Sequence, residues 1–129
     1  LPFQPREELS DVLCAADVHA VAIRDDFVGV QHPCKAYNAL AVGRPLLLLG
    51  PEHSPWKEWV ETGAAWRYES GSARDIADAV LGLANDPTRT SQAGRIALDL
   101  ARARYPQDAG RARIADAVLS CVRSGTSSP

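Results

Sequence analysis

Three short apolar runs, each adjoining a helical segment, restrict the possible folds of this chain more than any other feature. The runs are Val18–Ile23, Pro45–Leu49 and Ala64–Tyr68. Their nearly continuous apolar character is typical of strands buried on both faces of a parallel sheet. Strands that alternate with helices over short connections form right-handed βαβ units. The pattern therefore predicts an α/β fold, with a Rossmann-like parallel sheet and helices on both faces.

The helical segments are separated by glycine and proline residues. Gly43 and Pro45 end the second segment, and a proline follows both Asp86 and Tyr105, where it disfavours the helical conformation of the residue before it. In chain order we predict helices over Arg6–Ala16, Cys34–Val42, a segment around Trp56–Val60, Arg74–Asn85, Gln92–Arg104 and Gln107–Val122.

The predicted sheet is small for a nucleotide-binding domain. Leu1–Gln4 is a candidate fourth strand, whereas a complete sheet of this kind has about five or six strands. We therefore expect a sheet truncated at its amino-terminal side, and a chain that is part of a longer protein. The expected organisation is one partial domain over residues 1–123 and a flexible tail over residues 124–129.

Composition excludes several classes of protein. The chain has 129 residues, of which 46% are apolar, and its 14 Lys+Arg against 16 Asp+Glu give a net charge of −2, which disfavours a nucleic-acid partner. Its apolar runs are shorter than the roughly 20 residues of a bilayer-spanning helix, and it begins without a signal peptide. We expect a soluble, cytoplasmic protein.

No metal site is predicted. The three cysteines, Cys14, Cys34 and Cys121, form no CxxC pair and are expected to be reduced thiols. No set of His, Cys, Asp and Glu residues has the spacing of metal ligands.

The connection Arg24–Pro33 carries the strongest signal for a binding site. It follows the first predicted strand, and ligands of open α/β sheets bind beyond the carboxyl ends of the strands. Gly29 permits close approach of the backbone, and the helix that begins after Pro33 offers free N–H groups to an anion. Lys35 adds a cation in the first helical turn, which suggests an anionic partner such as a phosphate. On these residues alone, an ordinary solvated loop with an extended lysine is equally favoured.

A resemblance to a known family supports the interpretation of this connection as a binding site. It is carried by Ala16–His19, by His32–Pro45 and by Gly50–Glu52, and it continues through Gly63, Leu83, Asp86, Pro87, Arg89 and Gly94. These residues resemble the carboxyl-terminal, donor-binding domain of retaining group 1 glycosyltransferases, which have the two-domain GT-B architecture. The segment Lys35–Pro45 is the most specific part, and it is similar to the family pattern PSK-x-Y-x-x-x-A-x-G-x-P.

The resemblance implies a nucleotide-sugar donor, no further cofactor, and an amino-terminal acceptor domain that this sequence does not contain. It implies a donor site made of Phe27, Val28, Gly29, Val30, Gln31, His32, Lys35 and Asn38. Asn38 stands where the family has an acidic residue that binds the ribose, so it retains hydrogen bonding without the charge. The family's first acidic residue falls near Val30, or at Asp25 or Asp26. No catalytic residue is identified, because the basic pair of the family lies upstream of Leu1.

Two other functions remain open. One is a non-catalytic α/β binding module that has lost the site, which Asn38 would permit. The other is a sugar-nucleotide epimerase, which shares the two-domain architecture. As a transferase, this chain alone is expected to bind donor without turnover.

The remaining candidate residues are assigned mainly structural roles. His19 is expected to be a satisfied sheet residue, whereas His32 and His53 lie where they would face the ligand crevice. We expect Trp56 and Trp59 to be core or domain-interface anchors, and Trp66 to be in the core. The arginines near the carboxyl terminus are most simply a solvated surface. They are Arg102, Arg104, Arg111 and Arg113. A minor alternative is that they contact anionic lipids at the inner face of the membrane, since many members of the family that the chain resembles use lipid-linked acceptors.

Overall fold

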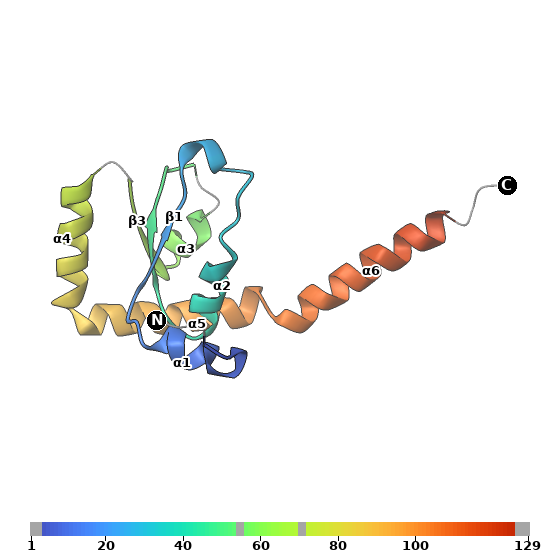
Figure 1. Cartoon of the computed structure of the whole chain (residues 1–129), viewed down its shortest axis with the longest axis horizontal. Coiled ribbons are helices and arrows are strands. Elements are labelled where there is room, and N and C mark those ends of the chain that lie inside the picture. The colour runs from blue at the N-terminus through green and yellow to red at the C-terminus, as the bar shows by residue number, and fades with distance from the viewer. Residues whose placement is uncertain (1–3, 54–55, 70–71, 126–129) are drawn as a thin grey trace.

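The computed structural model describes residues 4–53, 56–69 and 72–125 and shows an α/β fold (Figure 1). In chain order its elements are the 3-10 helix η1 (Arg6–Glu8), α1 (Leu9–Cys14), β1 (His19–Ala22), the 3-10 helix η2 (Asp25–Phe27), α2 (Cys34–Ala41), β2 (Leu46–Leu49), α3 (Lys57–Glu61), β3 (Ala65–Tyr68), α4 (Ala73–Ala84), α5 (Pro87–Arg104) and α6 (Gln107–Gly125). The predicted alternation of strands and helices is confirmed. Of the predicted strand Leu1–Gln4, only Gln4 is among the described residues, and it lies outside the strands.

The three strands form one parallel sheet in the order β1-β2-β3. His19 pairs with Leu46, which pairs in turn with Ala65. Each strand has four residues and lies within the apolar run that predicted it. Because all strands point the same way, their carboxyl ends meet at one edge of the sheet, where a binding site is expected.

One face of this sheet forms the core together with the helices that cover it. Trp56 and Trp59 are 1% and 2% exposed, which confirms the prediction that they are core residues. The other buried residues on this side are Val21, Ile23, Leu46, Leu48, Ala64 and Ala65 on or next to the strands, Ala36, Ala39 and Leu40 of α2, and Ala97 and Ala101 of α5.

Two glycines allow α2 and α5 to pack closely. Gly43 ends α2 with a φ of +73°, a conformation that L side chains rarely adopt. A Cβ placed on Gly94 of α5 would lie 2.5 Å from the Gly43 carbonyl oxygen. Only glycine at position 94 therefore fits this contact without a shift of the backbone.

Side-chain caps determine where α4 and α5 begin. The Ser72 hydroxyl accepts a hydrogen bond from the Asp75 amide, and Asp86 accepts one from the Arg89 amide at 2.9 Å. With Pro87 as its first residue, α5 begins five residues before the predicted Gln92. The prediction was wrong here because apolar periodicity begins only after the capped first turn.

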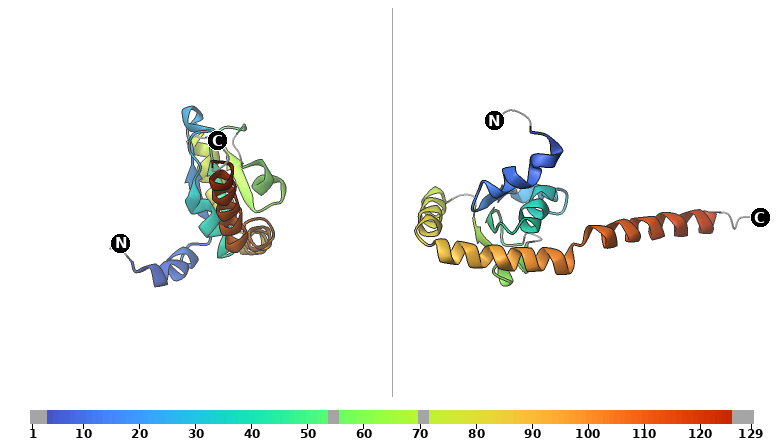
Figure 2. Two further views of the ribbon diagram at one scale, coloured as in Figure 1. Left: turned by 90° about the vertical axis from the view of Figure 1, so that its right-hand side faces the viewer. Right: turned by 90° about the horizontal axis from the view of Figure 1, so that it is seen from below.

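Two apolar helical faces lie exposed. Leu9 and Val12 of α1 are 43% and 40% exposed, and Ile114 and Val118 of α6 are 68% and 57% exposed. Figure 2 shows α6 extending away from the body of the protein. Although periodicity places these residues on common faces, no described element packs over them. α6 also continues to Gly125, two residues into the predicted tail.

The second face of the sheet is only partly covered. Ala20 and Ala22 of the edge strand β1 are exposed on this side. α4 and the first half of α5 lie across from it and leave a groove of about 680 Å³. The expectation of helices on both faces is therefore met only in part.

Candidate functional site

The candidate site lies on the connection from β1 to α2, at the carboxyl edge of the sheet. Neighbouring connections begin at Gly50, after β2, and at Glu69, after β3. Gly50 is required where it stands, because a Cβ there would approach the Ile23 side chain to 2.8 Å and the Ile23 carbonyl oxygen to 3.0 Å. The edge of the sheet is thus closely packed beneath the β1–α2 connection.

The first half of the connection is stabilised by its own side chains. Arg24 Nη2 lies 2.7 Å from Asp26 Oδ2, and its guanidinium stacks 5.6 Å from the centre of the Phe27 ring. Phe27 is 42% exposed. Val28 follows and is half-buried against the core. The connection therefore turns outward at Phe27 and is anchored again by Val28.

The middle of the connection is open to solvent. Gly29 has a φ of +84°, and a Cβ placed on it would have no heavy atom within 4 Å. Val30 is 84% exposed, and Gln31 is also exposed. A tight turn is maintained because the amides of Val30 and Gln31 both donate to the Phe27 carbonyl, at 3.1 and 2.9 Å. Gly29 gives an approaching ligand access to the backbone.

His32 links the end of the connection to an aromatic cluster. Its Nε2 is hydrogen-bonded to the hydroxyl of Tyr37 in α2. The Tyr37 ring meets Trp59 edge-on with 5.3 Å between ring centres, and Tyr105 edge-on with 4.8 Å. Such T-shaped pairs are favourable beyond the area they bury. Tyr37 matches the tyrosine of the family pattern, but neither it nor the distant Tyr105 was predicted to belong to the site.

A polar chain continues from this cluster to α5. Trp59 Nε1 donates to the Tyr105 hydroxyl at 3.0 Å, and this hydroxyl donates to Glu58 Oε2 at 2.8 Å. Glu58 Oε1 lies 3.0 Å from Arg104 Nε. The Trp59 indole, the Tyr105 hydroxyl and both oxygens of the Glu58 carboxylate therefore each have a partner.

Burial controls the ionisation of both tyrosines. Desolvation raises the pKa of Tyr37 above its ordinary value, and Cys34 and Glu58 add to the effect. Desolvation likewise raises the pKa of Tyr105; the Trp59 hydrogen bond opposes this rise and Glu58 adds to it. Both hydroxyls therefore keep their protons to a higher pH than an exposed tyrosine does.

The amino terminus of α2 differs from those of α4 and α5 because no side chain caps it. Pro33 precedes the helix, and its carbonyl accepts from the Ala36 amide at 3.0 Å. Lys35 is exposed in the first turn, which contains no acidic residue. Asn38 is also exposed, one turn further along the same face. The structure therefore places two of the predicted binding residues together on α2, next to the loop that holds the other six.

Asn38 also borders a hollow of about 550 Å³ between α2 and the junction of α5 with α6. Its lining residues are Tyr37, Asn38, Ala41, Ala101, Arg102, Tyr105, Pro106 and Gln107. Asn38 and Arg102 supply hydrogen-bonding side chains, while the two tyrosines supply aromatic surface. Of the predicted binding residues, only Asn38 reaches this hollow.

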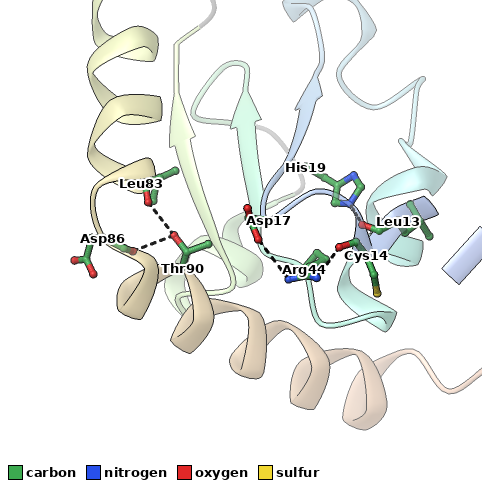
Figure 3. A network of polar contacts seen from close by, with 8 residues as sticks. All are labelled: Leu13, Cys14, Asp17, His19, Arg44, Leu83, Asp86 and Thr90. Carbon is green, nitrogen blue, oxygen red and sulfur yellow. Dashed lines mark hydrogen bonds and ion pairs between the residues drawn. The ribbon is translucent and has the colours of Figure 1, made fainter. Parts of the chain in front are cut away.

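The larger groove of 680 Å³ contains none of the predicted binding residues, because it lies toward the amino ends of the strands. Its rim includes Arg44, which donates to the Cys14 carbonyl at 2.6 Å and lies 3.8 Å from Asp17 (Figure 3). Nearby, His19 Nε2 lies 2.9 Å from the Leu13 carbonyl oxygen (Figure 3). The interpretation of His19 as a satisfied sheet residue is confirmed.

Other predicted residues have different environments. His53 is exposed in the connection after β2. Trp66 is half-buried rather than fully in the core, and Arg89 stacks over it at 5.3 Å from the ring centre. Among the carboxyl-terminal arginines, Arg104 pairs with Glu58, and Arg111 lies 3.8 Å from Asp108. The solvated surface is therefore partly neutralised by neighbouring carboxylates.

The described part of the chain contains neither a candidate metal site nor a candidate membrane span. No group of three His, Cys, Asp or Glu side chains there is placed to hold a metal ion. No helix within the same residues is both long and apolar enough to cross a bilayer.

Comparison with known proteins identifies no relative. No protein-family model matches the chain, and no match is found among curated proteins or solved structures.

Proposed function

We propose that this chain is the nucleotide-sugar donor-binding part of a glycosyltransferase that transfers a sugar from a nucleoside diphosphate to an acceptor. The observation that carries the proposal is the β1–α2 connection. An open, glycine-containing loop leads there into an uncapped helix with a lysine in its first turn. The similarity of Lys35–Pro45 to group 1 glycosyltransferases supports the same conclusion. We infer that the three strands belong to a larger Rossmann-like sheet of GT-B architecture.

The roles of the residues follow from their chemistry. The free N–H groups at the start of α2 would donate to the diphosphate, with the helix dipole favouring its negative charge. Lys35 would add a charge-assisted hydrogen bond, and Gly29 would let the loop backbone approach the phosphates. Asn38 would both donate to and accept from ribose hydroxyls. These residues would bind and orient the donor, and another domain would bind the acceptor.

The proposal implies that the phosphates account for a large part of the affinity. Titration of the protein with a panel of nucleoside diphosphates, and with inorganic pyrophosphate, would be followed by NMR shift mapping and calorimetry. We expect weak binding, with shifts concentrated in the loop from Phe27 to His32 and in the first turns of α2. Shifts confined to α4, α5 and α6 would contradict the assignment.

Lys35→Ala tests the role of the charge. We expect it to weaken the binding of a nucleoside diphosphate by about 1.5–3 kcal/mol while leaving the free nucleoside unaffected. The matched control is Lys57→Ala on α3, where Lys57 pairs with Glu61 at 3.5 Å on the exposed surface. An equal loss for both ligands would place Lys35 away from the phosphates.

A non-catalytic binding module remains the second candidate, because Asn38 lacks the negative charge of the family's acidic residue. A sugar-nucleotide epimerase of the same architecture is the third. Recovery of the sequence upstream of Leu1 discriminates among them, since an amino-terminal Rossmann-like domain with a glycine-rich first loop favours transfer.

A further inference from the structure

The loop of the candidate site has few attachments to the rest of the protein. Its backbone hydrogen bonds are local, from Phe27 to Arg24, from Val28 to Asp25, and from Val30 and Gln31 back to Phe27. Arg24 pairs with Asp26 inside the same segment. Among the described residues of the loop, Val28 packs against the core and Pro33 is buried at the start of α2. Between these two anchors, the His32 side chain is hydrogen-bonded to the side chain of Tyr37, outside the loop.

The partner of His32 is itself firmly held. Tyr37 projects from α2, whose residues Ala36, Ala39 and Leu40 are buried. Its ring contacts Trp59 and Tyr105 edge-on. Trp59 is 2% exposed and donates to the Tyr105 hydroxyl. The Tyr37 hydroxyl is therefore held by several contacts, whereas the loop that reaches it has few contacts outside itself.

We propose that the hydrogen bond between His32 and Tyr37 is a latch that positions the β1–α2 loop for a phosphate-bearing ligand. Tyr37 is then a positioning residue, which acts on the ligand through His32 and the loop backbone. The ligand class rests on the proposed function. The latch itself rests on the contacts of His32 and Tyr37. An unlatched loop would retain Val28 and the buried Pro33 as its anchors, and ligand binding would then have to order the residues between them.

Tyr37→Phe removes the latch and retains the ring that packs on Trp59 and Tyr105. Loss of one neutral hydrogen bond corresponds to about a five-fold change in an equilibrium constant. In the protein without ligand, we expect amide hydrogen exchange at Val30 and Gln31, which both donate to the Phe27 carbonyl, to become about five-fold faster. The dissociation constant for inorganic pyrophosphate should rise by a similar factor.

Tyr105→Phe is the matched control, because it removes a hydroxyl from the same aromatic cluster without touching the loop. In this variant, the loop amides should exchange hydrogen at the wild-type rate. A second pair of variants tests His32, the other partner in the hydrogen bond, by amide hydrogen exchange alone. His32→Gln places an amide near the former Nε2 position and should retain slow exchange, whereas His32→Leu should reproduce the effect of Tyr37→Phe.

Wild-type exchange rates in Tyr37→Phe would overturn the latch, whether or not pyrophosphate binds. Fast exchange in Tyr105→Phe would also overturn it, since the cluster as a whole would then be responsible. If Tyr37→Phe speeds exchange but neither pyrophosphate nor any nucleoside diphosphate binds the wild type, the proposed function fails. The assigned ligand fails with it, while the contact that orders the loop is supported.

Discussion

Gly94→Ala should destabilise the protein, although alanine is the better helix former. The new Cβ would lie 2.5 Å from the Gly43 carbonyl oxygen and 3.6 Å from Pro45 Cδ. Overpacking costs about 1–3 kcal/mol. We expect a cost near the upper end of this range, because the neighbouring atom belongs to the backbone and cannot move aside as a side chain can. Replacement of glycine inside a helix recovers about 1 kcal/mol. The expected result is a net loss of about 2 kcal/mol in the free energy of unfolding.

The matched control is Gly82→Ala in α4. A Cβ on Gly82 meets no heavy atom within 4 Å, so the helix gain of about 1 kcal/mol should appear undiminished. The same chemical change therefore has opposite signs at two helical glycines, and the two variants should differ by about 3 kcal/mol. Urea denaturation followed by circular dichroism measures both values. A Gly94→Ala variant at least as stable as the wild type would refute the claim that this contact sets the spacing of α2 and α5.

Two further predictions concern the candidate site and its aromatic cluster. Asn38→Glu should strengthen binding of a nucleoside diphosphate by restoring a charged acceptor for the ribose, and Asn38→Leu should weaken it without unfolding the protein; unchanged affinity in Asn38→Leu, measured by calorimetry, would favour the non-catalytic module. At alkaline pH, the raised pKa values of Tyr37 and Tyr105 mean that the unfolded state loses these protons first. Stability should therefore fall as the pH rises past the ordinary tyrosine value of 10.0 toward the folded-state values. The double variant Tyr37→Phe/Tyr105→Phe should flatten this decline in denaturant midpoint, and an unchanged decline would contradict the burial effect.

Local sequence patterns were sufficient to predict the three strands, the six α-helices and their order, but not the 3-10 helix η2. Apolar runs a few residues long predicted the three strands, because a strand buried on both faces has no polar alternation. Glycine and proline placed the helix boundaries after Ala41 and before Gln107 to within a residue, since their backbone preferences are local. The helix that begins at Pro87 was an exception, because its cap at Asp86 lies nearly two helical turns before the apolar pattern.

Contacts between distant parts of the chain were decided only by the tertiary structure. Tyr37, Trp59 and Tyr105 meet because α2, α3 and the end of α5 converge, and nothing local marks these three side chains as neighbours. Periodicity likewise assigns Ile114 and Val118 to one helical face, yet both are exposed. A helical repeat specifies which residues share a face, but burial also requires a second surface to cover that face. The same limit applies to the candidate site, where sequence placed Lys35 and Asn38 one turn apart and the fold brought Tyr105, at the end of α5, against Tyr37.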